Sequence, residues 1–130
     1  MKTSVALCFL VATASAALAA GDHGKAPAPI FESPLADVPG KHLVVVHLKF
    51  EPGKPSTAHR HPGSVYVYVT KGTVKLGKAG EPVQTVHAGE SFFEPVGAVH
   101  TVGESASPTE SAEAIAVMIV PDGQPLVLPQ

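Results

Sequence analysis

Three of the seven histidines in this 130-residue chain have a spacing that suits metal binding. His59 and His61 are separated by one residue, so on a β-strand both imidazole rings point to the same face. Such a pair alone is as typical of a core or surface position as of a ligand pair. His100, however, follows a turn-like segment with Pro95 and Gly97 that leads back into a strand. Since imidazole nitrogens bind divalent transition metals, the three residues predict a site for one ion, such as iron, zinc or manganese.

The other four histidines lack such a context. His23 and His42 lie in or near a segment rich in proline and glycine, and we expect both to be solvated. His47 lies within a run of β-branched residues, where it could take either face of a strand. His87 precedes a glycine turn. All four lie outside the predicted set of three metal ligands.

Short strand-like runs separated by turns must position the three histidines. The runs are rich in β-branched and aromatic residues, and glycine or proline bounds each of them. They cover residues 43–50, 65–69, 73–76, 83–86, 91–94 and 114–120. Short strands broken by turns about every 8–12 residues are typical of an antiparallel sandwich or barrel. No amphipathic segment of helical length is visible, so we expect an all-β fold.

The N-terminal residues have the features of an export signal. Lys2 is followed by an apolar run over residues 5–14 that is too short to span a membrane, and Ala17-Leu18-Ala19 fits a cleavage site. The alternatives are a buried N-terminal helix or a retained anchor. We therefore expect a signal peptide over residues 1–19, an extended lead-in over 20–39 and a single domain over 40–130. The mature protein is then exported, to a periplasm or to the outside of the cell.

The composition excludes several function classes. The formal net charge is −2, and there is neither a basic run nor a ladder of aromatic residues, so nucleic acid is not expected as a partner. Cys8 is the only cysteine and lies in the predicted signal. The mature chain should therefore have no disulfide, no thiolate ligand and no cysteine nucleophile. After cleavage we expect no contact with the membrane, since no remaining segment could cross it.

The spacing of these residues resembles the two sequence motifs of the cupin family. The first motif is matched by Gly53, five residues, the pair His59 and His61, three residues, Val65, six residues and Gly72. The second is matched by Gly89, five residues, Pro95, one residue, Gly97, two residues, His100, three residues and Glu104. The resemblance extends over residues 44–120. Every glycine, the proline and the three histidines fall at the spacing that the family has.

Two positions depart from the family pattern. Val65 stands where the first motif has an acidic metal ligand, and Glu104 stands where the second has asparagine. Valine cannot coordinate a metal, so a three-histidine site remains unless another side chain fills the gap. The candidates are Glu94, Gln84, His87 and Tyr66, and Glu94 comes first because it ends a strand six residues before His100. Three neutral imidazoles leave the ion its full positive charge, which favours anionic or chelating ligands.

The resemblance implies a single antiparallel cupin β-barrel of the jelly-roll type, with a small polar or anionic molecule bound beside the metal. Whether the protein is an enzyme stays open. Three functions fit: a metal-binding module or enzyme of broad cupin type, a three-histidine non-haem iron dioxygenase, or a non-catalytic storage, binding or sensory barrel. In the dioxygenase, Glu94, Tyr66 or Tyr68 would handle protons. The resemblance also suggests a homodimer, for which residues 114–120 are either a contact or, more in keeping with their pattern, a core strand.

Overall fold

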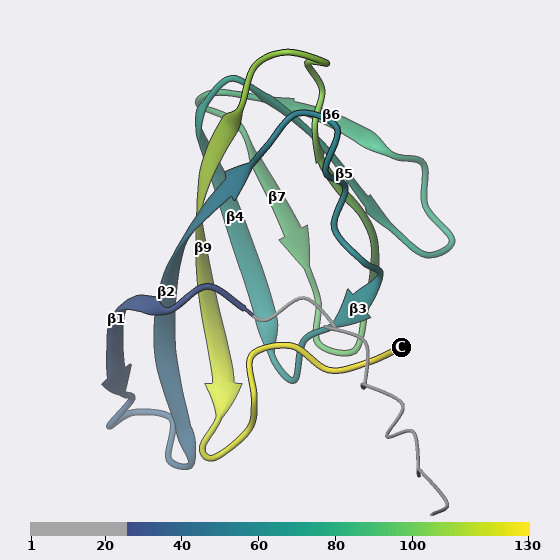
Figure 1. Ribbon diagram of the computed structural model, residues 1–130. Coiled ribbons are helices and arrows are strands. Elements are labelled where there is room, and N and C mark those ends of the chain that lie inside the picture. Colours follow the sequence, from purple (N-terminus) through teal and green to yellow (C-terminus); the bar gives the residue numbers. More distant parts are fainter. Residues whose placement is uncertain (1–25) are drawn as a thin grey trace, which may run out of the picture.

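The computed structural model describes residues 26–130 and shows an all-β fold there (Figure 1). The predicted signal peptide and His23 lie outside the described residues. The strands are β1 (Pro29–Pro34), β2 (Lys41–Phe50), β3 (His59–Arg60), β4 (Ser64–Lys71), β5 (Thr73–Lys78), β6 (Gln84–His87), β7 (Ser91–Glu94), β8 (Val99–Ser105) and β9 (Ala112–Pro121). Residues 26–130 contain no helix that could cross a membrane. The predicted all-β class is therefore confirmed.

The strands form two sheets in which all neighbours are antiparallel. One sheet has the order β1-β2-β9-β4-β7, and the other has the order β3-β8-β5-β6. Strands that are neighbours in a sheet are often distant in sequence, as with β2 and β9, which is typical of a jelly roll. Figure 1 shows the two sheets facing each other, with the C-terminal segment running across one end beside β3. The hydrogen-bonded pairings define two sheets and not a continuous ring of strands.

The core lies between the sheets and follows the two-residue period of the strands. On β4, Val65, Val67 and Val69 are buried, whereas Tyr66 and Tyr68 face outward. Each buried valine stabilises the fold by about 1.5–3 kcal/mol through loss of apolar surface from water. The neighbouring strand β9 has small residues on the same inner side of the sheet, namely Ala112, Ala114 and Ala116. Because alanine ends at Cβ, this stretch leaves room between the sheets.

Exposed apolar side chains gather on the outer face of the five-stranded sheet. Tyr66 lies opposite Phe93 of β7 and Val117 of β9, and Tyr68 lies opposite Ile115. Tyr66, Tyr68 and Phe93 are each about half exposed. β9 itself pairs with β2 on one side and with β4 on the other, so residues 114–120 form a central core strand with no free edge.

The structure differs from the sequence expectations near the N-terminus. Part of the expected lead-in is the edge strand β1, which pairs with β2. Its prolines are compatible with a strand because an edge strand leaves one row of N–H groups unpaired. The expectation that His42 is solvated is wrong: only 9% of its surface is exposed. Its ring lies between two carboxylates. Nε2 is 3.0 Å from Oε1 of Glu32 on β1, and Nδ1 is 2.9 Å from Oδ1 of Asp122, which follows β9.

Candidate metal centre

Strand pairing brings the three predicted histidines together. His59 on the short strand β3 lies directly opposite His100 on β8. His61 directly follows β3, and its Nε2 lies 3.1 Å from Nε2 of His59. One ring nitrogen from each of the three residues falls within a group whose members are all within 4.8 Å of one another. The residues that the sequence placed 39 and 41 positions apart therefore form one cluster at the edge of the four-stranded sheet.

Two glycines allow the backbone to turn at this cluster. Gly63 follows the His59–His61 pair, and a Cβ there would overlap the carbonyl oxygen of Ile119 on β9. The chain can therefore pass close to β9 only because this residue lacks a side chain. Gly97 precedes β8 with a φ of 80°, a left-handed conformation that glycine adopts without strain. These local requirements explain why glycine occupies both positions.

Backbone carbonyl groups fix which nitrogen of each ring is free. Each imidazole donates one N–H to a carbonyl oxygen, and such an outer partner orients a ligand and sets its tautomer. The bonds run from His59 Nδ1 to Thr57 O (2.7 Å), from His61 Nδ1 to Leu126 O (2.6 Å) and from His100 Nε2 to Val102 O (2.6 Å). In the neutral rings, the remaining nitrogens are therefore lone-pair acceptors. These are Nε2 of His59, Nε2 of His61 and Nδ1 of His100.

This arrangement fits a divalent metal ion. Two lone pairs that face each other at 3.1 Å, as in His59 and His61, repel unless a cation or a proton lies between them. Ligand nitrogens that each lie about 2.0–2.1 Å from one ion are roughly 3–4 Å apart, which includes the observed distance. Three imidazole nitrogens suit zinc, iron, manganese, nickel and copper alike. The donor set therefore supports metal binding without selecting the metal.

Burial keeps the rings available to a metal at neutral pH. It lowers the pKa of His100 to about 4, with a smaller contribution from the nearby His59. Burial also lowers the pKa of His61, against the hydrogen bond to the Leu126 carbonyl. Both rings are therefore neutral near pH 7, and no proton competes with a metal ion for their free nitrogens.

The structure places Glu94 beside two of the histidines. Glu94 ends β7 of the other sheet, and only 2% of its surface is exposed. Its Oε1 lies 3.5 Å from Nδ1 of His100, and its Oε2 lies 3.9 Å from Nε2 of His61. Among the described residues, Oε2 has no hydrogen-bond partner. Burial raises the pKa of this carboxyl to about 7, against the charge of Lys78, so these contacts are not ion pairs with charged rings.

The other candidates for an additional ligand lie elsewhere. Tyr66 is 45% exposed on the outer face of its sheet, because its neighbours Val65 and Val67 take the inner face. The expected role of Tyr66 in handling protons at the site is therefore wrong. Gln84 and His87 are exposed on β6, where His87 Nδ1 lies 3.1 Å from Oγ1 of Thr73. Of the four candidates, only Glu94 faces the histidines.

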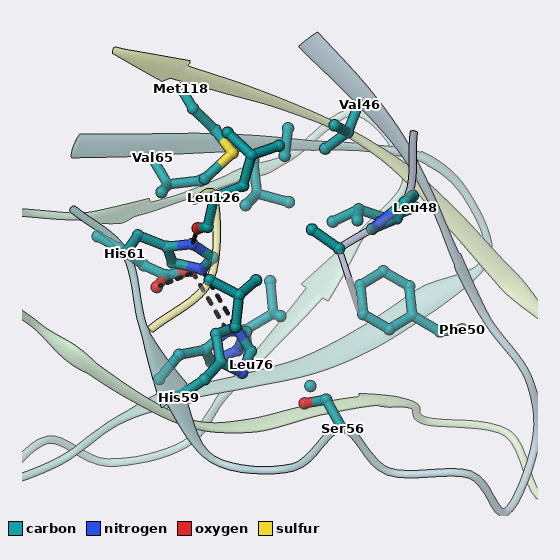
Figure 2. A pocket seen from close by; sticks show the side chains of 18 of the residues that line it. Val46, Leu48, Phe50, Ser56, His59, His61, Val65, Leu76, Met118 and Leu126 are labelled. Atoms are coloured by element: carbon teal, nitrogen blue, oxygen red, sulfur yellow. Dashed lines mark hydrogen bonds and ion pairs between the residues drawn. The ribbon is translucent and has the colours of Figure 1, made fainter. Parts of the chain in front are cut away.

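A cavity of about 300 Å³ opens beside the three histidines and Glu94. Its walls are mostly apolar and include Val46, Leu48, Phe50, Val65, Val67, Leu76, Ala116, Met118 and Leu126. Figure 2 shows His59 and His61 beside each other, with Leu48 and Phe50 across the cavity. The polar residues Lys49, Lys54, Ser56 and Thr57 also contribute to the lining. The expected ligand was polar or anionic, whereas this space suits a small molecule with an apolar body and one polar group.

The C-terminal segment contributes to the site in a way that the sequence did not indicate. The Leu126 carbonyl accepts the hydrogen bond from His61, and the Leu126 side chain lines the cavity. Leu128 and Arg60 exchange backbone hydrogen bonds of 2.8 and 2.9 Å, which anchors the segment to β3. A main-chain carbonyl has no signature in the amino-acid type, so no motif could have identified this contact.

Comparison with known proteins agrees with this geometry. The sequence profile of the cupin domain matches residues 46–118, which is more than half of the chain. The chain belongs to the cupin family. This stretch includes the three histidines and Glu94, so the site lies inside the part of this cupin that defines the family. No curated protein sequence matches the chain.

Several solved structures share the cupin fold. A cupin-like protein from Thermotoga maritima is 28% identical, with a TM-score of 0.50, over 61% of this chain and 56% of that one. The DMSP lyase DddQ from Ruegeria pomeroyi is 18% identical, with a TM-score of 0.56, over 70% of this chain and 43% of that one. An oxalate oxidase in complex with the substrate analogue glycolate is 24% identical, with a TM-score of 0.54, over 68% and 45%. This cupin spans about half the length of these relatives, and the two enzymes establish a shared fold only.

Proposed function

We propose that this cupin binds one divalent metal ion through His59, His61 and His100 and binds a small molecule next to that ion. The observation that carries the proposal is the set of three free ring nitrogens, each fixed by a hydrogen bond on the opposite side of its ring. These hydrogen bonds fix the tautomer and orientation of each ring before a metal binds. A bound divalent ion would act as a Lewis acid toward a polar group of the small molecule.

The cavity supports a ligand with two unlike parts. Apolar side chains such as Leu48, Phe50 and Met118 favour an apolar body, and the volume of about 300 Å³ limits it to a small molecule. The end of the cavity with the histidines favours a chelating or anionic group. The low exposure of His61, His100 and Glu94 strengthens electrostatic interactions at this end. Glu94 lies at the same end, with its carboxyl oxygens 3.5 Å from Nδ1 of His100 and 3.9 Å from Nε2 of His61.

Metal analysis tests this proposal. The chain purified without an affinity tag and reconstituted with iron, zinc or manganese should contain about one metal ion per protein. The variant with His59→Ala, His61→Ala and His100→Ala should contain none. A control with His47→Ala and His87→Ala, which removes two exposed histidines, should retain the metal. Equal metal content in the wild type and the triple variant would refute the proposed site.

The second candidate is a non-haem iron dioxygenase. It is supported by the three imidazole ligands and by Val65, which replaces the acidic ligand on β4. Loading the protein with iron and screening oxygen consumption against thiols, diketones and phenols tests it. Turnover that is lost in a His100→Ala variant would support this activity. Metal and ligand binding without turnover would instead support the non-catalytic binding, storage or sensory role.

We also propose that the mature protein is exported. The support is the pattern of residues 1–19, with Lys2, an apolar run and the small-residue sequence Ala17-Leu18-Ala19. Intact-mass analysis of the protein from periplasm or culture medium should show a chain that begins near Ala20. Recovery of the uncleaved chain in the cytoplasm would contradict export.

A further inference from the structure

We infer that Glu94 is the carboxylate ligand of this metal centre and supplies from β7 the group that Val65 lacks on β4. The inference rests on the proposed metal site and adds a fourth ligand to it. It makes the centre a three-histidine, one-carboxylate site that spans both sheets. His59 and His100 lie on the four-stranded sheet, His61 directly follows β3, and the carboxylate lies on the five-stranded sheet.

The register of the five-stranded sheet places Glu94 next to Val65. The two residues are direct partners in the antiparallel pairing of β4 and β7. Side chains of such partners point to the same face, with Cβ atoms about 4.5–5.5 Å apart. Both side chains are buried and both line the cavity. A carboxylate can therefore reach the same space from either strand. In this chain it comes from Glu94 on β7, and the apolar residue Val65 takes the position on β4.

The distances from Glu94 to the histidines agree with a shared ion. Its two oxygens lie 3.5 Å from Nδ1 of His100 and 3.9 Å from Nε2 of His61. Atoms that each bind one ion at about 2.0–2.2 Å are roughly 3–4 Å apart, so both values fit. The nitrogens concerned are the lone-pair acceptors, since the opposite nitrogen of each ring donates to a carbonyl. An ionised carboxylate gains nothing from facing two acceptors unless a cation lies between them.

Within residues 26–130, Lys78 is the one cation whose charge acts on Glu94, and the two form no ion pair. Oε2 is buried and makes no hydrogen bond to any of the residues that the structure describes. Lys78 approaches from β5, but its ammonium group donates to the Phe93 carbonyl at 3.0 Å and pairs with Glu81 at 3.1 Å. Within residues 26–130, no Lys or Arg forms an ion pair with Glu94. Since a buried carboxylate without a partner is costly, this arrangement points to a bound cation.

A fourth ligand of this kind changes the chemistry expected of the centre. A carboxylate lowers the charge of a divalent centre from +2 to +1. The centre then suits a ligand with one anionic or chelating group better than a dianion. This agrees with the mostly apolar walls of the cavity next to the centre.

Exchanging the two residues tests the inference. Chelator competition should show that Glu94→Val lowers the affinity for zinc and manganese at least tenfold. The double variant Val65→Glu/Glu94→Val, which has the same composition as the wild type, should restore the affinity to within about threefold. X-ray absorption of the zinc-loaded proteins should show that the zinc ion in Glu94→Val has one protein oxygen ligand fewer than the zinc ion in the wild type. Circular dichroism and thermal melting of the metal-free proteins establish that each variant is folded.

Glu94→Gln keeps the shape of the side chain and provides a test if an apolar or exchanged residue prevents folding. It should also lose affinity at least tenfold, because a neutral amide oxygen is a weaker ligand than a carboxylate. If the wild type binds metal and Glu94→Gln binds it equally well, Glu94 is not a ligand, while the three-histidine site stands. If the wild type binds no metal, the proposed function and this inference both fail.

Discussion

Replacing Glu94 with glutamine should stabilise the metal-free protein at alkaline pH and not at acid pH. Burial raises the pKa of Glu94 from 4.5 to about 7, so the folded state holds this proton more tightly than the unfolded state. The contribution of Glu94 to stability therefore falls as the pH rises from 4.5 through about 7. The difference between the pKa values of the folded and unfolded states corresponds to a loss of about 3 kcal/mol in the free energy of unfolding above pH 7.

Urea unfolding of both proteins in the presence of a chelator, from pH 4 to pH 8, measures this effect. Glu94→Gln should be more stable than the wild type by about 3 kcal/mol at pH 8, or by roughly 10 °C in melting temperature, and of similar stability at pH 4. The lowered pKa of His100, about 4, means that acidification below 6.5 destabilises both proteins. This effect largely cancels in the difference between them.

A Glu110→Gln variant is the matched control, because this glutamate is exposed and its carboxylate forms no ion pair with any of residues 26–130. It should change stability by less than about 0.5 kcal/mol at every pH. The reasoning is refuted if Glu94→Gln differs from the wild type by the same amount at pH 4 and pH 8, or if it is the less stable protein at pH 8.

Three further predictions concern the C-terminal segment, the turn at Gly63 and the outer face of the five-stranded sheet. Leu128→Pro removes the N–H that donates to the Arg60 carbonyl, so chelator competition should show metal affinity lowered about tenfold, whereas Gln130→Ala should leave it unchanged. Gly63→Ala should lower the free energy of unfolding in urea by about 3 kcal/mol, because the methyl group overlaps a backbone oxygen; an unchanged midpoint would contradict the structure. We also propose a homodimer through the outer face of the five-stranded sheet. Sedimentation velocity should show a dimer for the wild type and a monomer for Tyr68→Lys, and a monomeric wild type would exclude it.

The alternation of apolar and other residues, together with the spacing of the histidines, is sufficient to predict most strands and the histidine cluster. Alternation of valine and tyrosine over residues 65–69 fixes which side chains of β4 are buried, because successive residues in a strand face opposite sides. The same alternation places Tyr66 outside once Val65 is in the core. The exposed position of Tyr66 was therefore available from the sequence. Its expected role is wrong because the face that a strand residue takes, and not its side-chain chemistry, decides whether it reaches the site.

The edge strand β1 and the burial of His42 could not be read from local pattern. β1 contains two prolines, and its pairing with β2 depends on an edge position that only the assembled sheet defines. His42 is buried because Glu32 and Asp122, 80 residues beyond it, close around its ring. A histidine next to a proline-rich segment carries no local sign of such a contact.

The sequence by itself determined the all-β class and the identity of the three histidines, because spacing within a strand and around a turn fixes which faces the side chains take. Only the tertiary structure decided what surrounds them. The pairing of β4 with β7 placed Glu94 opposite Val65, and the return of the C-terminal segment placed the Leu126 carbonyl on His61. Both depend on the register between distant segments and on main-chain atoms common to every residue, which the order of side chains does not encode locally.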